Sequence, residues 1–458
     1  MKVTLRQRLG LQKGGAAVSM TEGPIAKSIL MFAIPLFMGQ LLQQFYNMAD
    51  AWVIGNFADN DAFAAVSSAG SMTLLIVGLF NGIAIGGGVI ISKYYGAGDK
   101  ENVVKAIHTN FLFGIIASIL STVVGLVLVP HMLNWMNIPE SVMPNSLSYF
   151  QIYFGGVSTV IMYNICMSIM RALGDSIHPL YYLMFSSAVN VVLDLLFGAV
   201  FDWGVAGAAT ATVIAQGLSV EFCLIRMCRS TEYTRLDFRK LHFYKDIMLE
   251  VIKQGLPTGI QTSVSSIGNI VVQSNINSFG AYAMAGVGAY AKIEGFVFLP
   301  IMSMSMALPT FISQNLGAGK YDRVKQGQRA GILMGFIIAV PFFLLCFFQS
   351  EMLIRLFMQE ETGVAMSTGV EFLRIVAPFY FVVSMKLSTD GALRGSGAMS
   401  WFMIATFSDL ILRVVLGYVL AVPFGTTGIW MSWPIGWAIG TVMSLVFFAK
   451  GVWKQKSK

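Results

Sequence analysis

The sequence has few charged residues for its length. Only 12% of its 458 residues are Asp, Glu, Lys or Arg, whereas about a quarter are charged in a soluble globular chain. This scarcity and a mean hydropathy of +0.70 exclude a soluble globular protein. Each apolar run has on the order of 20 residues or more, which is enough to cross a bilayer as a helix. Because the runs lack the alternation of barrel strands, we expect an all-α polytopic membrane protein.

Cysteine and histidine are also scarce, with four of each. The cysteines lack metal-ligand spacing, and we interpret them as core residues: Cys166, Cys223, Cys228 and Cys346. No Walker motif indicates ATP hydrolysis, and no Ser-His-Asp, Cys-His or His-Glu-x-x-His arrangement indicates an enzyme. The glycines of 82–88 do not follow a strand as a phosphate loop would, so we expect them to allow close helix packing.

Basic residues are missing from two long stretches, between Met31 and Ser92 and between Pro179 and Leu224. Asp50 lies in the first stretch, whereas Asn190 and Asp194 lie one helical turn apart in the second. No neighbour along the helix neutralises these carboxylates. An acid of this kind inside a membrane has to be protonated, bind a cation or face water, and therefore indicates a functional site.

The net charge of +7 is distributed over alternate connections between the apolar runs. Lys and Arg gather in the N-terminal arm, between the second and third runs, in 226–253, in 320–329 and at the C-terminal end. The positive-inside rule then places both termini in the cytoplasm. We expect a multi-pass protein of the cell membrane with no nucleic-acid partner, whose first span is retained as an anchor.

Polar breaks divide the chain into twelve predicted spans. The spans lie at 28–55, 63–92, 105–130, 144–170, 178–201, 204–226, 248–279, 283–313, 329–349, 365–392, 399–421 and 427–449. The longest basic connection separates six spans from six. The expected organisation is a cytoplasmic arm at 1–27, an N-lobe at 28–228, a basic cytoplasmic linker at 229–247, a C-lobe at 248–449 and a cytoplasmic tail at 450–458.

The two halves repeat at an offset of roughly 222 residues. Matching positions include Pro35 with Pro257, the Gly-Ala-Gly of 96–98 with that of 317–319, and Arg171 with Arg394. Because each half holds an even number of spans, both halves have the same orientation. We therefore expect two pseudo-symmetric lobes, related by an axis along the membrane normal, which is a common arrangement in transporters.

The motif Gln-Asn-Leu-Gly-Ala-Gly-Lys at 314–320, with Arg323 after it, resembles the multidrug and toxic compound extrusion (MATE) family, as does Ala-Leu-Arg-Gly at 392–395. The resemblance extends from Ile29 to Phe448. It implies a twelve-helix, two-lobed exporter of the prokaryotic type. Such a protein exports organic, usually cationic or amphipathic, compounds in exchange for Na+ or H+, so its partners are small molecules and the bilayer.

Position by position, the resemblance assigns the cation site of the N-lobe to Asp50, Asn190, Asp194 and Thr212. If odd spans run outward, Asp194 and Thr212 both lie about 10 Å below the outer surface. Their oxygen donors suit Na+, and two neighbouring carboxylates also suit H+, so the residues do not choose between the ions. The alternative is that both acids are protonated and bond only to neighbouring helices, or that Asp50 faces water.

Charges within the spans of the C-terminal half come as pairs of opposite sign. The pairs are Lys292 with Glu294, Glu371 with Arg374, and Asp409 with Arg413. We interpret them as structural or gating ion pairs, with substrate contact or proton relay as the alternatives. One MATE subgroup carries acids in the seventh and tenth spans, but 261–279 and 379–388 contain none here.

Polar and aromatic residues on the first and fourth spans, with one acid on the eighth, are candidates for a substrate cavity. They are Gln43, Gln44, Tyr46, Asn47, Tyr153, Tyr163, Asn164 and Glu294. Hydrogen bonds between packed helices are the alternative for each of them.

A flippase for lipid-linked glycans, built on a related two-lobed architecture, is the main alternative function. Such a protein needs a cationic cavity for phosphate, which the shortage of Lys and Arg in the N-lobe spans disfavours. A receptor or a membrane-embedded hydrolase explains neither the repeat nor the lone acids. We expect a monomer with no cofactor, only a coupling ion, H+ or Na+.

Overall fold

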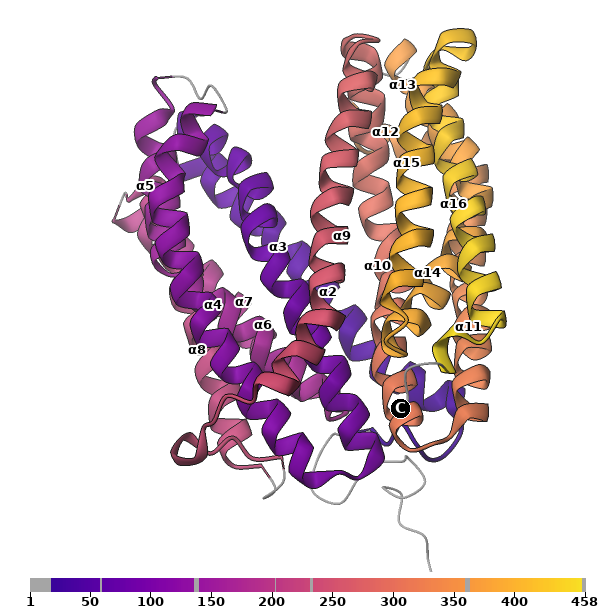
Figure 1. Ribbon diagram of the computed structural model, residues 1–458. Helices are drawn as coiled ribbons and strands as arrows, with labels where there is room; N and C mark the ends of the chain where they lie inside the picture. The colour runs from indigo at the N-terminus through magenta and orange to yellow at the C-terminus, as the bar shows by residue number, and fades with distance from the viewer. Residues whose placement is uncertain are drawn as a thin grey trace, which may run out of the picture. The chain divides into compact units, whose positions relative to one another are not determined.

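The computed structural model describes residues 18–57, 60–135, 140–201, 203–230, 234–358 and 363–454, and within these ranges the side chains of 49–57, 60–76, 135 and 199 are not described. The regular elements of these ranges are helices (Figure 1), which confirms the all-α prediction. No cis peptide bond occurs in the described chain.

The helices carry the labels of Figure 1. The first half contains α2 (Ile25–Phe57), α3 (Asn60–Ala97), α4 (Lys100–Trp135), α5 (Met143–Gly155), α6 (Val157–Ala172), α7 (Ile177–Leu195), the π-helix η1 (Leu196–Val200) and α8 (Gly204–Cys228). The second half contains η2 (Phe238–Lys240), α9 (Lys245–Asn277), α10 (Ala281–Gly317), α11 (Tyr321–Phe348), α12 (Ser350–Arg355), α13 (Val364–Val376), η3 (Ala377–Phe379), α14 (Tyr380–Gly395), α15 (Met399–Phe424), α16 (Thr426–Ala449) and η4 (Val452–Lys454).

Helices lie at each of the twelve predicted spans. In the described ranges, nine of them are long and apolar enough to cross a membrane, and α5 with α6, bent by 45°, makes a tenth. The seventh and tenth predicted spans do not qualify: α9 is long enough but has a low apolar content, and α13 with 13 residues and α14 with 16 are each too short. Polar uncharged residues interrupt the apolar character of α9, and α14 carries Lys386, Asp390 and Arg394.

The repeat is visible in the glycines that end corresponding helices. Gly98 and Gly319 have φ of 71° and 69°, and Gly174 and Gly397 have φ of 87° and 75°. A positive φ at this position closes a helix at low steric cost only for glycine. In the turn after Gly98, Asp99 accepts hydrogen bonds from the backbone and the side chain of Asn102, in the first turn of α4. These hydrogen bonds hold the pKa of Asp99 below its usual value.

The structure forms two compact units, each described by itself: unit 1 comprises 1–19 and 38–260, and unit 2 comprises 20–37 and 261–458. The boundaries fall inside α2 and α9. The first part of α2 and the second part of α9 belong to unit 2, and the remaining parts of both helices belong to unit 1. The expected lobes, 28–228 and 248–449, have their limits at the connections between helices, unlike these units. Their limits stay a prediction.

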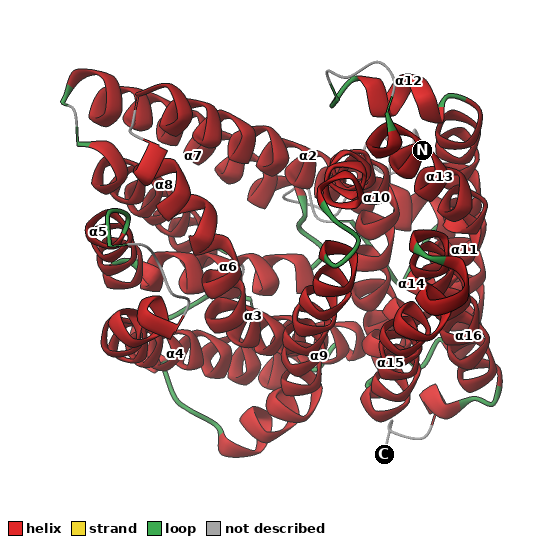
Figure 2. Ribbon diagram, turned by 90° about the horizontal axis from the view of Figure 1, so that it is seen from above, coloured by secondary structure: helices red, strands yellow, loops and turns green. Residues whose placement is uncertain are grey.

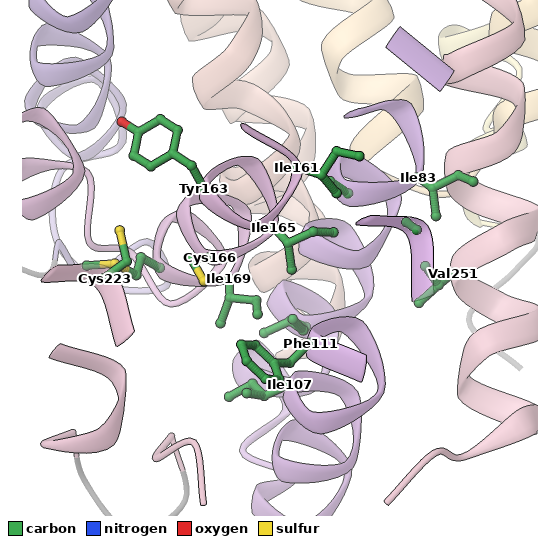
Figure 3. Close-up of a cluster of buried hydrophobic side chains, with 14 of the residues drawn as sticks. Ile83, Ile107, Phe111, Ile161, Tyr163, Ile165, Cys166, Ile169, Cys223 and Val251 are labelled. Carbon is green, nitrogen blue, oxygen red and sulfur yellow. The ribbon is translucent and has the colours of Figure 1, made fainter. Parts of the chain in front are cut away.

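Unit 1 is built around an apolar cluster drawn from α3, α4, α5, α6, α8 and the start of α9. Figure 3 shows Ile107 and Phe111 of α4 facing Ile165 and Ile169 of α6. The predicted core cysteines fit this picture, because Cys166 and Cys223 in unit 1 and Cys346 in unit 2 are buried, whereas Cys228 is half-buried.

Glycines bring α3 and the first part of α9 into backbone contact within unit 1. A Cβ on Gly82 would lie 2.2 Å from the Gly259 nitrogen, and one on Gly86 would lie 2.4 Å from the Gly255 nitrogen. Only glycine fits at such distances. The interpretation of 82–88 as a packing surface is therefore confirmed.

Unit 2 has its own apolar cluster, in which aromatic rings connect α10, α13 and α16. The rings of Phe372 and Trp430 stack with centroids 4.2 Å apart, and the Tyr290 ring lies 3.8 Å from that of Phe372. In this unit α15 and α16 run side by side (Figures 1 and 2), and a Cβ on Gly428 would lie 2.1 Å from the Leu420 carbonyl oxygen. The two helices are thus packed at backbone distance near their connection.

Candidate cation site

Three of the four predicted cation-site residues meet between α7 and α8. With its amide oxygen facing α8, Asn190 accepts a hydrogen bond from the Thr212 backbone N–H at 3.2 Å. Its amide nitrogen donates to Asp194 Oδ2 at 2.7 Å. Asn190 is 1% exposed and Asp194 is 2% exposed, so the amide and the carboxylate are both buried.

Tyr46 of α2 joins this cluster, since its hydroxyl lies 3.3 Å from Thr212 Oγ1. The sequence indicates Tyr46 only as a cavity residue, and the contact depends on packing between distant helices. Asp50, the fourth predicted member, follows Tyr46 by one helical turn on α2, but its side chain lies outside the described part of the structure.

Local backbone features hold Asp194 beside α8. The π-helix η1 begins two residues after Asp194, and short π-helical segments are frequent at functional sites. Phe197 of η1 packs on Gly207 of α8, where a Cβ would lie 2.8 Å from that of Phe197. The small residues Ala208 and Ala211 are buried on the same helix, which lets α7 approach closely.

The cluster presents oxygen atoms of three kinds, from a carboxylate, an amide and hydroxyls. Hard cations such as Na+ prefer such oxygen ligands, and a buried carboxylate also accepts a proton. Because no Lys or Arg occurs between Pro179 and Leu224, neither α7 after its first turns nor most of α8 supplies a compensating charge. The described residues contain no group of three or more His, Cys, Asp or Glu placed to hold a metal ion.

The predicted cavity residues of α2 differ in burial from those of α5 and α6. Gln43 and Asn47 of α2 are exposed, and Gln44 is half-buried. Tyr153 and Tyr163 lie instead in the apolar cluster of unit 1, where Figure 3 shows Tyr163. Asn164, another predicted cavity residue, donates from its amide nitrogen to the Val160 carbonyl of its own helix at 2.9 Å.

Of the predicted charge pairs in unit 2, the one joining Asp409 and Arg413 is present, with N to O distances of 3.3 Å. The other acids have different partners. Glu294 accepts a hydrogen bond from the Tyr290 hydroxyl at 2.6 Å, and Glu371 accepts one from the Thr427 hydroxyl.

The basic residues assigned to those acids are also placed elsewhere. Arg374 donates from Nε to Ser350 Oγ at 2.9 Å, and Lys292 is exposed. No ion pair within the described ranges joins Lys292 to Glu294 or Arg374 to Glu371, which corrects these two pairings. Residues two apart on a helix point in different directions, and for Glu371 and Arg374 contacts to other helices replace the local one.

Sequence reasoning missed one group of charges. Lys386 and Asp390 of α14 form an ion pair at 2.7 Å, and Lys386 also lies 3.6 Å from Asp409 of α15. Their spacing of four residues inside a predicted span was the available signal.

Comparison with known proteins identifies the fold and the family. The family model described as MatE matches residues 35–196 and 257–419, one match in each half. The chain is 27% identical over 446 residues to the probable multidrug resistance protein YpnP of Bacillus subtilis (strain 168), covering 96% of this chain and 98% of that protein. It is 24% identical over 414 residues to the multidrug export protein MepA of Staphylococcus saprophyticus, covering 89% and 90%.

Solved structures show the same architecture. An outward-facing conformation of a multidrug resistance MATE family transporter of the MOP superfamily matches with a TM-score of 0.90 and 20% identity, over 98% of this chain and 100% of that one. The fold is accordingly that of MATE transporters, with twelve transmembrane helices in two lobes. Since the family model matches both halves and most of the chain, this protein belongs to the MatE family of membrane transporters and is not an enzyme.

Proposed function

We propose that the protein exports small organic compounds, cationic or amphipathic, across the cell membrane in exchange for Na+ or H+. The observation that carries this proposal is the buried carboxylate of Asp194, in contact with Asn190, whose amide oxygen in turn accepts a hydrogen bond from the Thr212 backbone. The names of the relatives, multidrug resistance and export proteins, support the substrate class. We assign the coupling site to these three residues together with Asp50.

Two further observations support the assignment. Tyr46 reaches Thr212, which brings the part of α2 that carries Asp50 toward the cluster. The matching position in the other half differs, because Asn190 aligns with Arg413 and Asp194 with Gly417. The scaffold is duplicated while the oxygen cluster is not, as expected for one coupling site per chain.

Coupling follows if the cation and the exported compound favour different conformations of the transporter. A cation arriving from outside would neutralise Asp194 and stabilise the arrangement of α2, α7 and α8 that holds it. The exported compound would favour the arrangement without the cation. Each binding event then shifts the population toward release of the other ligand.

The proposal is tested with purified protein in sealed vesicles that contain a fluorescent organic cation. Imposing an inward Na+ gradient at equal pH, or an inward proton gradient without Na+, should drive efflux of the dye in one of the two cases. Vesicles with no gradient serve as the control. Dye retention under both gradients would contradict ion-driven export and would favour the flippase alternative.

Replacing Thr212 with Val should weaken cation coupling without abolishing it. The change removes one hydroxyl, and a neutral hydrogen bond or ligand contact contributes about 1 kcal/mol, so the half-activating Na+ or H+ concentration should rise about fivefold. Thr210→Val is the matched control, because the Thr210 hydroxyl donates to the Ala206 carbonyl of its own helix at 2.7 Å. An equal effect of both changes would speak against a Thr212 contact with the ion.

We also propose a substrate-contacting surface on α2 and an orientation for the chain. Gln43 and Asn47 are exposed on α2, as residues that meet a substrate would be. The distribution of Lys and Arg supports cytoplasmic positions for both termini, and we propose that the chain acts as a monomer.

A further inference from the structure

Unit 2 contains four charged side chains that neutralise one another inside the membrane-spanning helices. Lys386 Nζ lies 2.7 Å from Asp390 Oδ2 and 3.6 Å from Asp409 Oδ2. Arg413 Nη2 lies 3.3 Å from both carboxylate oxygens of Asp409. Lys386 is 4% exposed, Asp390 is 3% exposed and Asp409 is 4% exposed, so the group is removed from solvent.

The neighbouring helix α16 is shaped to receive these side chains. A Cβ on Gly440 would lie 2.7 Å from Lys386 Cε, and a Cβ on Gly436 would lie 2.6 Å from Asp409 Oδ1. One turn beyond Gly440, the Ser444 hydroxyl donates to Asp390 Oδ1. The two glycines leave room for the charged groups, and the serine adds a polar contact.

The oxygens around the Lys386 ammonium resemble a cation site. Two carboxylates lie around it, and the Ser444 hydroxyl bonds one of them, a set of oxygen donors that suits a small hard cation. Here the positive charge at the centre belongs to the chain itself. Arg413, whose guanidinium lies 4.7 Å from the centroid of the Trp433 ring, supplies the second positive charge, so the four side chains are balanced.

The repeat makes the contrast with unit 1 clear. Arg413 stands at the position that Asn190 occupies in unit 1, and Asp409 corresponds to Ser186 at the same offset. In unit 1, the buried acid Asp194 accepts a hydrogen bond from the neutral amide of Asn190. In unit 2, the buried acids are paired with an ammonium and a guanidinium.

We propose that Lys386 is a tethered counter-cation, whose ammonium fills a site between Asp390 and Asp409 that would otherwise take up a free monovalent cation. This group of four side chains therefore reaches charge balance without an external ion. A consequence, which rests on the proposed function, is that export uses only the coupling site of unit 1.

Removing the Lys386 charge should convert this part of unit 2 into an ion-dependent site. In Lys386→Met, Asp390 and Asp409 lose the ammonium that lies between them, so the four-residue group keeps two carboxylates and only one of its two cations. An uncompensated buried charge is strongly unfavourable. The variant should recover balance by binding Na+ or a proton. A ligand that binds only the folded protein raises the unfolding temperature with its concentration.

The test measures the midpoint of thermal unfolding of the full-length protein in detergent. NaCl is exchanged for choline chloride at constant ionic strength in one arm, and pH is varied without Na+ in the other. All variants carry Asp194→Asn, which weakens cation binding in unit 1, and each is compared with an Asp194→Asn parent, so any response that unit 1 retains is common to all of them and failure of the proposed coupling site leaves the comparison unaffected. Glu294 and Arg394, the other charges that act on the group, are common to all variants.

Lys386→Met should gain a midpoint increase of about 2 °C or more with Na+ or with falling pH, relative to its parent. Adding Asp390→Asn restores charge balance and should abolish the gain. A variant as insensitive as its parent overturns the proposal, as does a gain that persists with Asp390→Asn. If Lys386→Met does not fold, Asp390→Asn should rescue it, and failure of this rescue also overturns the proposal.

Discussion

Replacing Asp194 with Asn is expected to weaken binding of the coupling cation by about 10- to 100-fold, and gradient-driven export should fall with it. Bonds to a charged group contribute about 1.5–3 kcal/mol, and each 1.4 kcal/mol corresponds to a factor of ten. Asn has nearly the shape of Asp and keeps one oxygen, so the contact with Asn190 is perturbed less than the charge is. The loss should therefore reflect the missing carboxylate rather than collapse of α7.

The measurement is dye efflux from vesicles under the gradient that drives the wild type, together with the unfolding temperature of each protein. Asp322→Asn is the matched control, because Asp322 is an exposed acid in the first turn of α11. It should export at the wild-type rate. Wild-type efflux by Asp194→Asn would remove Asp194 from the coupling site, whatever the behaviour of Asp322→Asn.

The helices and the repeat could be predicted because both depend on local properties of the sequence. Apolar runs of membrane length define the spans. Glycines such as Gly98 and Gly319 end corresponding helices because only they adopt the required positive φ cheaply. The seventh span, α9, was delimited by polar breaks like the others, and it matches the first span through Pro257 and Pro35.

The candidate site could be predicted only in part. Asn190 and Asp194 share one face of a helix through their spacing of four residues, which is local information. Thr212 came from resemblance to a family, and the contact of Tyr46 with Thr212 depends on how α2 packs against α8. Sequence spacing alone contains neither contact.

The charges of unit 2 show the same limit. Local spacing predicted the Asp409–Arg413 pair correctly but joined Glu371 to Arg374, although Glu371 binds Thr427 of α16. Lys386 and Asp390 satisfy the local rule, yet the neighbouring Asp409 becomes evident only when α14 and α15 are packed. Pairing within a membrane is decided by tertiary contacts that remove charges from lipid.

Replacing Gly86 with Ala should destabilise the protein by about 3 kcal/mol or more. The added Cβ would lie 2.4 Å from the Gly255 nitrogen and 2.5 Å from its Cα. Inserting carbon into a packed core commonly costs about 1–3 kcal/mol when side chains can move aside. Here the neighbour is backbone, so α3 and α9 have to separate along the whole contact that Gly82 and Gly259 continue.

Gly288→Ala, on the exposed side of α10, is the matched control for Gly86→Ala. A Cβ on Gly288 meets nothing within 4 Å, and alanine is favoured over glycine in a helix by about 1 kcal/mol. The two changes are chemically identical but should shift the unfolding temperature in opposite directions. Equal shifts would show that helix propensity, and not the backbone contact between α3 and α9, determines the effect of a methyl group at Gly86.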